Sequence, residues 1–145
     1  MSTPLSFYDN YTRSLRPFAP LHPQSGVGLY TCGPTVYDYQ HVGNYRTFLF
    51  EDLLKRVLVW NGRAVRHVMN ITDVGHLTSD ADAGDDKVEA AAARSGQTVA
   101  EITGRFTEQW ATDRRRLGCL EPDIRPAASE HIAEQIAMVQ ALEVK

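Results

Sequence analysis

An apolar run that ends in a Gly/Pro turn and leads into a helix is the feature that most restricts how this chain can fold. The apolar run covers residues 27–30, Gly33 and Pro34 form the turn, and residues 41–44 read His-Val-Gly-Asn. In α/β proteins, ligands bind beyond the carboxyl end of such a strand. The free N–H groups and the dipole of the helix's first turn favour phosphate there. The stretch therefore predicts a nucleotide-binding unit.

A second strand follows the helix. The pattern predicts a strand over residues 27–32, a helix over 43–60 that ends at Asn61-Gly62, and a strand over 64–71. We expect the helix to carry two i,i+4 ion pairs, Glu51 with Lys55 and Asp52 with Arg56. Its apolar stripe consists of Phe50, Leu53, Leu54, Val57 and Leu58. A strand–helix–strand order implies two parallel strands with a right-handed crossover.

Outside this strand–helix–strand unit, the sequence predicts an irregular N-terminal lead-in and several helices. Pro17, Pro20 and Pro23 predict an irregular lead-in over residues 1–24. Helices are expected over 86–95, over 98–117 (opened by a capping box at Thr98) and from 129 onward, with Pro122 and Pro126 in a loop between the last two. The stripe of the 98–117 helix is Val99, Ile102, Phe106 and Trp110, and that of the last helix is Ile132, Ile136 and Val139. No partner for the last helix can be found in the sequence.

Composition narrows the class of protein. A length of 145 residues fits one domain, and the net charge of −3 gives no overall basic field for binding nucleic acid. The run Arg114-Arg115-Arg116 is more typical of a solvated helix end than of an RNA contact. Two distant cysteines define no disulfide framework. With no signal-peptide core and no membrane-length apolar stretch, we expect a cytoplasmic protein without a membrane partner.

Several motifs together resemble one family. They are Cys-Gly-Pro-Thr-Val-Tyr-Asp at 32–38, His-Val-Gly-Asn at 41–44, Arg-Thr-Phe at 46–48, Asn-Ile-Thr-Asp at 70–73 and Pro-Asp-Ile-Arg-Pro-Ala at 122–127. The set resembles the cysteinyl-tRNA synthetases, which are class I aminoacyl-tRNA synthetases, and residues 41–44 look like the "HIGH" motif of that class. The match covers nearly the whole chain but only about the first third of the family's length, the N-terminal segment of the catalytic domain.

The resemblance implies an α/β fold. Residues 1–78 would form the first half of a Rossmann-like domain of the HUP type found in class I synthetases, a parallel βαβ unit. Residues 79–145 would form a helical segment that leads into the family's inserted connective domain. This arrangement is incomplete relative to the family.

The implied function lies in protein biosynthesis. A cysteine–tRNA ligase activates cysteine with ATP to cysteinyl-adenylate and transfers it to tRNA(Cys). The second ATP motif of the family (KMSKS), its later zinc ligands and its anticodon-binding domain are absent from this sequence, so we expect the chain alone to be inactive. The family is usually monomeric, whereas uncovered apolar surface predicts that this chain self-associates.

Two alternatives remain open from the residues. The chain could be a short stand-alone paralogue that forms an adenylate or an amide on a small molecule. It could also be a non-catalytic interaction module that retains half of the fold. A longer open reading frame would favour the ligase.

The resemblance also assigns an ATP site. His41 and Asn44 would bind the ATP phosphates and stabilise the α-phosphate while a carboxylate attacks it, through positioning and preorganised donors. The rest of the ATP site would be Gly33, Pro34, Thr35 and Gly43. The alternative is purely structural: Asn44 caps the helix and His41 packs in the turn. Asn44 stands where the class motif often has a second histidine, so it can donate a hydrogen bond but carry no charge.

The amino-acid site involves other residues. In the family, the cysteine matching Cys32 ligates a zinc ion that holds the substrate thiolate, and soft thiolates do prefer zinc. A strand cysteine is otherwise an inert, small apolar residue. Thr72 would line the pocket, unless it only shapes a turn, and Tyr37 with Asp38 would lie at its rim. Cys119 falls outside the family's ligand pattern.

One further group of residues could suggest a metal-binding site. His76, Asp80, Asp82, Asp85 and Asp86 lie close together in the sequence but do not have EF-hand spacing. A solvated acidic loop explains them better. His67, inside a predicted strand, is expected to be a packing residue.

Overall fold

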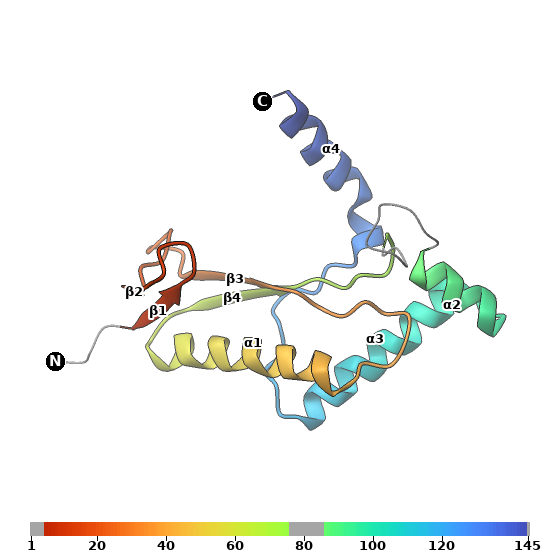
Figure 1. Ribbon diagram of the computed structural model, residues 1–145, viewed down its shortest axis with the longest axis horizontal. Helices are drawn as coiled ribbons and strands as arrows, with labels where there is room; N and C mark the ends of the chain where they lie inside the picture. The colour runs from red at the N-terminus through yellow and green to blue at the C-terminus, as the bar shows by residue number, and fades with distance from the viewer. Residues whose placement is uncertain (1–4, 76–85, 145) are drawn as a thin grey trace.

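Two parallel strands with a helix alongside them form the centre of the fold. The computed structural model describes residues 5–75 and 86–144. Strand β3 (Val27–Thr31) pairs in parallel with β4 (Val65–Met69), with Val27 opposite Val65 and Thr31 opposite Met69. Helix α1 (Val42–Trp60) connects them and lies along them (Figure 1). The predicted parallel βαβ unit is confirmed.

A third extended segment flanks β4. Ile124 bridges Val68 and Ala127 bridges Ile71, both in parallel. The backbone N–H of Met69 donates to the Ile124 carbonyl at 3.0 Å, and that of Ile71 donates to the Pro126 carbonyl at 2.8 Å. Sequence patterns place residues 122–126 in a loop. The prolines are tolerated because Pro126 contributes a carbonyl, so the N–H that it lacks is not needed for this bond.

The expected irregular lead-in is wrong for residues 6–17, whereas residues 18–25, which include Pro20 and Pro23, contain no strand, as expected. Strands β1 (Ser6–Asp9) and β2 (Ser14–Pro17) form an antiparallel hairpin. Asp9 closes it by accepting from the Tyr11 N–H at 2.8 Å and from Arg16 at 2.7 Å. Pro17 lies at the end of a two-stranded ribbon, a position where a missing N–H is tolerated. Pro17 therefore does not prevent strand formation at this position.

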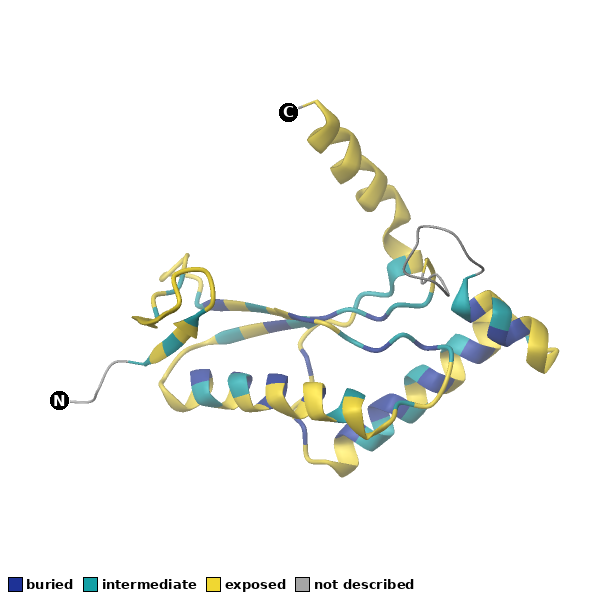
Figure 2. Cartoon of the chain, viewed as in Figure 1, coloured by how far each residue is buried: buried dark blue, intermediate teal, exposed yellow. Residues whose placement is uncertain are grey.

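Of the expected apolar stripe of α1, Leu58 is buried, Leu54 and Val57 are half-buried, and Phe50 and Leu53 are exposed. Phe50 is 67% exposed and Leu53 is 57% exposed, whereas the buried residues of the helix are Phe48, Glu51, Asp52, Lys55 and Leu58 (Figure 2). The stripe instead lines an apolar cavity of about 450 Å³ together with Phe7, Phe18, Val27, Gly28 and Leu29. Helical periodicity finds the two faces of α1 but does not tell which one the sheet covers.

Long-range partners stabilise the charged face of α1. Asp52 pairs with Arg56 at 2.6 Å, as expected, and also accepts the Leu120 N–H at 2.7 Å. Lys55 does not make the expected pair with Glu51. It donates to the Glu121 carbonyl at 2.7 Å and lies 3.4 Å from the Asp123 carboxylate. These contacts satisfy polar groups whose burial would otherwise be costly.

Helices α2 (Lys87–Ser95) and α3 (Val99–Arg116) complete the core. Asp86 caps α2, the Thr98–Glu101 capping box opens α3, and Gly96 ends α2 in the left-handed conformation. Ile102, Phe106 and Trp110 are buried as predicted, although Val99 is 39% exposed. They pack against Val36, Phe48, Met69 and Ile71, with the Phe48 and Trp110 rings edge to face at 5.9 Å. The core thus joins the strand ends to α3.

Arg114 departs from the expected solvated helix end. It is 1% exposed, its guanidinium lies 5.1 Å from the centre of the Trp110 ring, and its Nη2 donates to the Leu120 carbonyl at 2.9 Å. Arg115 and Arg116 are exposed, as expected. The error arises because the chain turns back at Gly118 and covers the end of α3.

The last helix projects away from the body of the fold (Figure 1). Helix α4 (Ile132–Glu143) follows the 3-10 turn η1 (Ala128–His131) and has no buried residue. Helix α4 is exposed along its length (Figure 2), and its apolar residues Ile132, Ile136 and Val139 are among the exposed ones. Self-association stays a prediction. Among the described residues, no helix combines the length and apolarity needed to cross a membrane.

Candidate functional site

A cavity lies where β3 ends and α1 begins. Its volume is about 430 Å³. Its lining residues are Cys32, Gly33, Pro34, Thr35, Tyr37, Asp38, Tyr39, Gln40, His41, Asn44, Thr47 and Phe48. All the proposed site residues except Gly43 and Thr72 are in this lining. The sequence therefore predicted most of the residues that the fold brings together here.

His41 and Asn44 cap α1 reciprocally. The Gly43 N–H donates to His41 Nδ1 at 3.0 Å, and the His41 N–H donates to Asn44 Oδ1 at 3.1 Å. The capping role considered for these residues is therefore present. It leaves donors free for a ligand, because neutral His41 with an accepting Nδ1 carries its proton on Nε2. The Asn44 amide nitrogen is the second such donor.

The start of α1 favours an anion. No acidic residue lies in its first turn, so the positive end of the helix dipole is not neutralised by its own side chains. Among the described residues that line the cavity, Asp38 is the one carboxylate, and none is a lysine or arginine. A phosphate here would therefore be held by N–H donors and the helix end rather than by ion pairs.

Gly43 acts through its small size. A Cβ at this position would lie 2.8 Å from Cε1 and 3.0 Å from Nδ1 of His41. Any side chain would thus displace the imidazole from its capping position. Gly43 lies outside the cavity lining but fixes the orientation of a residue inside it.

Asn70 and Thr72, which follow β4, hold the turn after β3 from outside the cavity lining. The Gly33 N–H donates to Asn70 Oδ1 at 3.1 Å, and Asn70 Nδ2 donates to Thr72 Oγ1 at 3.0 Å. The Thr72 N–H donates to the carbonyl of the buried Pro34 at 2.9 Å. Thr72 and Pro34 therefore hold two strand ends together, and Thr72 itself does not line the cavity.

Helices α2 and α3 hold the outer wall of the cavity. The Tyr39 ring meets the Phe106 ring edge to face at 5.1 Å, and the Lys87 ammonium lies 5.8 Å from the centre of the Tyr37 ring. Gln40 Nε2 donates to the Thr35 carbonyl at 3.1 Å. The wall of the site therefore depends on residues that come at least fifty positions later in the chain.

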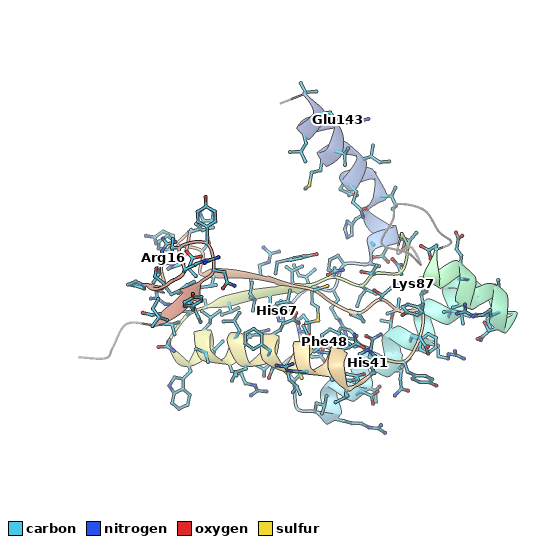
Figure 3. The ribbon with its side chains drawn as sticks, viewed as in Figure 1. Arg16, His41, Phe48, His67, Lys87 and Glu143 are labelled. Carbon is cyan, nitrogen blue, oxygen red and sulfur yellow. The ribbon has the colours of Figure 1, made fainter. Side chains whose placement is uncertain are left out.

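Sequence reasoning missed four lining residues: Tyr39, Gln40, Thr47 and Phe48. Thr47 and Phe48 could have been found, since they follow Asn44 at i+3 and i+4 and so share its face of the helix. No local sequence pattern identifies Tyr39 or Gln40 as residues of the cavity lining. Figure 3 shows His41 at the start of α1 and Phe48 further along the same helix.

Cys32 is the candidate zinc ligand. Its side chain is exposed at the cavity rim, and its thiol lies 3.6 Å from the Gly33 carbonyl. Within residues 5–75 and 86–144, no three His, Cys, Asp or Glu side chains converge as a metal site would require. These residues therefore supply one thiolate and do not by themselves fit a tetrahedral zinc ion, so we derive no step through zinc.

Within the described residues, neither Cys119 nor Asp86 belongs to a group that could hold a metal ion. Cys119 is buried, and its burial raises the pKa of the thiol. His76, Asp80, Asp82 and Asp85 lie outside the described residues. Asp86 accepts from the N–H groups of Gly75 and Val88, so it works as a cap.

The family of the chain follows from comparison with known proteins. Residues 17–145 match the family described as tRNA synthetases class I (C) catalytic domain. The chain belongs to this family. It is 55% identical over 140 residues to cysteine–tRNA ligase 1 of Burkholderia lata, which aligns with 97% of this chain. It is 44% identical over 142 residues to the cysteine–tRNA ligase of Zymomonas mobilis and 47% over 126 residues to that of Treponema denticola, covering 98% and 87% of this chain.

The chain corresponds to a small part of these relatives. It spans 30%, 27% and 25% of their lengths, respectively. Family membership and the class I catalytic fold are thereby established for the described α/β unit. The activity of a complete ligase is a separate matter.

Proposed function

We propose that this chain forms the first part of the catalytic domain of a cysteine–tRNA ligase and that its 430 Å³ cavity receives ATP and cysteine. One observation carries the proposal: free donors on His41 and Asn44 flank the start of α1 in the same cavity that has Cys32 at its rim. Residues 79–145 would lead into an inserted connective domain, with residues 123–128 returning to the sheet.

His41 and Asn44 would contribute to the reaction by positioning the ATP phosphates. The cysteine carboxylate attacks the α-phosphorus of ATP, a C–O–P bond forms, and the bond to pyrophosphate breaks. His41 Nε2–H and the Asn44 amide would donate to the phosphate oxygens as charge shifts toward the leaving pyrophosphate. Donors fixed in advance by the capping box need little reorganisation at that moment. The adenylate would then pass its cysteinyl group to tRNA(Cys).

Zinc enters only as an expectation of the family. When bound, it would hold the substrate thiol as a thiolate and so discriminate cysteine from serine. Cys32 would be one of its ligands. The named relatives are all ligases, so they lend no added weight to a stand-alone paralogue or an interaction module.

The test is cysteine-dependent exchange of pyrophosphate with ATP by the product of the complete gene. His41→Ala should lower kcat by about two orders of magnitude, as loss of one transition-state donor does. It should change the KM for ATP much less, since the contact strengthens in the transition state.

A matched control is His22→Ala, because His22 is exposed and lies outside the cavity lining. Circular dichroism checks the fold, since losing a helix cap costs about 1 kcal/mol. Unchanged exchange in His41→Ala would rule out the assigned role of His41.

A further inference from the structure

Cys32 lies between two residues that are each hydrogen-bonded to β4 or to the residue that follows it. Thr31 Oγ1 lies 2.9 Å from Nε2 of His67, and the Gly33 N–H donates to Asn70 Oδ1 at 3.1 Å. The Cys32 side chain is exposed, and its thiol lies 3.6 Å from the Gly33 carbonyl. The place of this thiol at the cavity rim therefore depends on how the backbone on each side of it is held.

The hydrogen bond between Thr31 and His67 is buried. Thr31 is 7% exposed at the end of β3, and His67 is 1% exposed on β4 (Figure 3). His67 is buried, as expected of a packing residue, but it also makes this polar contact. The imidazole donates or accepts according to its tautomer, and the Thr31 hydroxyl can take the complementary role. Because water does not compete for these atoms, the bond resists opening.

The backbone of His67 is fixed from its other side. Its N–H donates to the Asp123 carboxylate at 2.6 Å, and its carbonyl accepts the Asp123 N–H at 2.8 Å. The Lys55 ammonium of α1 lies 3.4 Å from the same carboxylate. The partner that β4 offers to Thr31 is therefore itself held by α1 and by the segment that flanks β4.

Stability alone gives no reason for a polar pair at this place. His67 Nδ1 is buried and has no hydrogen-bond partner among residues 5–75 and 86–144, which carries a free-energy cost. Replacing both partners of a buried hydrogen bond by apolar groups of similar shape can be nearly neutral for stability. An apolar pair would lack the directional contact that fixes the end of β3 in one position.

We propose that Thr31 and His67 are positioning residues: their hydrogen bond fixes the end of β3 and so holds the Cys32 thiol at the place where the cysteine substrate binds. The effect on the substrate rests on the proposed function, whereas the effect on the strand end does not. Thr31→Val removes the hydroxyl at nearly constant volume, and Thr31→Ser retains it. The double variant, Thr31→Val with His67→Leu, removes the bond without leaving one partner buried and unpaired.

Hydrogen exchange in the complete protein tests the hold on the strand end. The reporter is the Gly33 N–H, because its acceptor Asn70 is unchanged in these variants. It should exchange about tenfold faster in Thr31→Val and in the double variant, since the turn opens more often, and at nearly the wild-type rate in Thr31→Ser. The matched control is Thr103→Val on α3, whose hydroxyl donates to the Ala100 carbonyl within its own helix. It should leave the Gly33 rate unchanged.

Other outcomes of hydrogen exchange decide against the proposal. A wild-type Gly33 rate in the double variant would overturn it, because the bond would then not hold the turn. If neither valine variant folds, the wild-type amide decides: slow exchange supports a held turn, and exchange as rapid as in an unfolded chain overturns it.

Kinetics test the consequence for the substrate. In cysteine-dependent pyrophosphate exchange, the double variant should raise the KM for cysteine about tenfold and leave the KM for ATP within about twofold. Urea unfolding should show that it regains most of the stability lost in Thr31→Val. A KM for cysteine that recovers together with stability, or an equal rise in both KM values, would show a purely structural role and overturn the proposal. A wild-type protein without cysteine-dependent exchange would refute the proposed function instead, while hydrogen exchange would still test the hold on the strand end.

Discussion

Replacing Gly33 with alanine tests how closely the ends of β3 and β4 approach each other. A Cβ at Gly33 would lie 1.6 Å from the Asn70 carbonyl oxygen, 2.8 Å from its carbonyl carbon and 3.1 Å from Met69 Cγ. The two nearest atoms belong to the backbone, so no side-chain rotation removes the clash. The ends of β3 and β4 would have to separate by roughly 2 Å before the contact becomes ordinary.

The expected cost has two parts. Overpacking of this kind costs roughly 1–3 kcal/mol. Separating the strand ends also breaks the 3.1 Å hydrogen bond from the Gly33 N–H to Asn70 Oδ1, which contributes about 1 kcal/mol. We therefore expect Gly33→Ala to lower the free energy of unfolding by about 2–4 kcal/mol, a large share of the roughly 5–15 kcal/mol typical of a domain.

Urea unfolding followed by tryptophan fluorescence measures the change. Trp110 is 1% exposed and reports core opening, whereas Trp60 is 91% exposed and should respond little. The control is Gly104→Ala on α3, where a Cβ would meet no atom within 4 Å. Because alanine favours helix, this control should gain up to about 1 kcal/mol. A Gly33→Ala value within about 0.5 kcal/mol of wild type would refute the steric argument.

Four further predictions follow from the same structure. Arg114→Met should lower the free energy of unfolding by about 2 kcal/mol in urea unfolding, because the Leu120 carbonyl loses the charged donor that binds it at 2.9 Å. Burial and the charges of Lys55 and Arg114 lower the pKa of His67 below 6.5 in the folded state. The unfolded state therefore takes up the proton first, so stability should fall as pH drops below about 6.5, and His67→Gln should make the melting temperature less dependent on pH there. Gly43→Ala should change stability by less than about 1 kcal/mol, because the atoms it meets belong to a side chain that can move, yet it should lower pyrophosphate exchange at least about tenfold by displacing His41. The isolated chain should bind less than one equivalent of zinc by metal analysis after dialysis, and one tightly bound zinc would contradict the single-ligand interpretation of Cys32.

Local chemistry made much of this protein predictable from its sequence. The parallel strand pair, helices α1, α2 and α3 and the end of α2 at Gly96 follow from periodicity, capping residues and glycines. These signals act over a few residues, so the sequence alone displays them. The same holds for the cavity, because most of its lining lies in one continuous stretch between residues 32 and 44. A strand, a turn and a helix start bring such a stretch together locally, whereas its contacts with Asn70, Lys87 and Phe106 come from distant parts of the chain.

The tertiary structure decided which groups are buried. Only the fold puts Glu51, Asp52 and Lys55 inside and leaves Phe50 and Leu53 outside. The reason is that the partners of the buried face, such as the Leu120 N–H and the Glu121 carbonyl, come from a segment more than sixty residues later. The same turn of the chain buries Arg114. No periodicity in α1 or α3 can reveal this, because the free energy of burying a charge depends on the group that meets it.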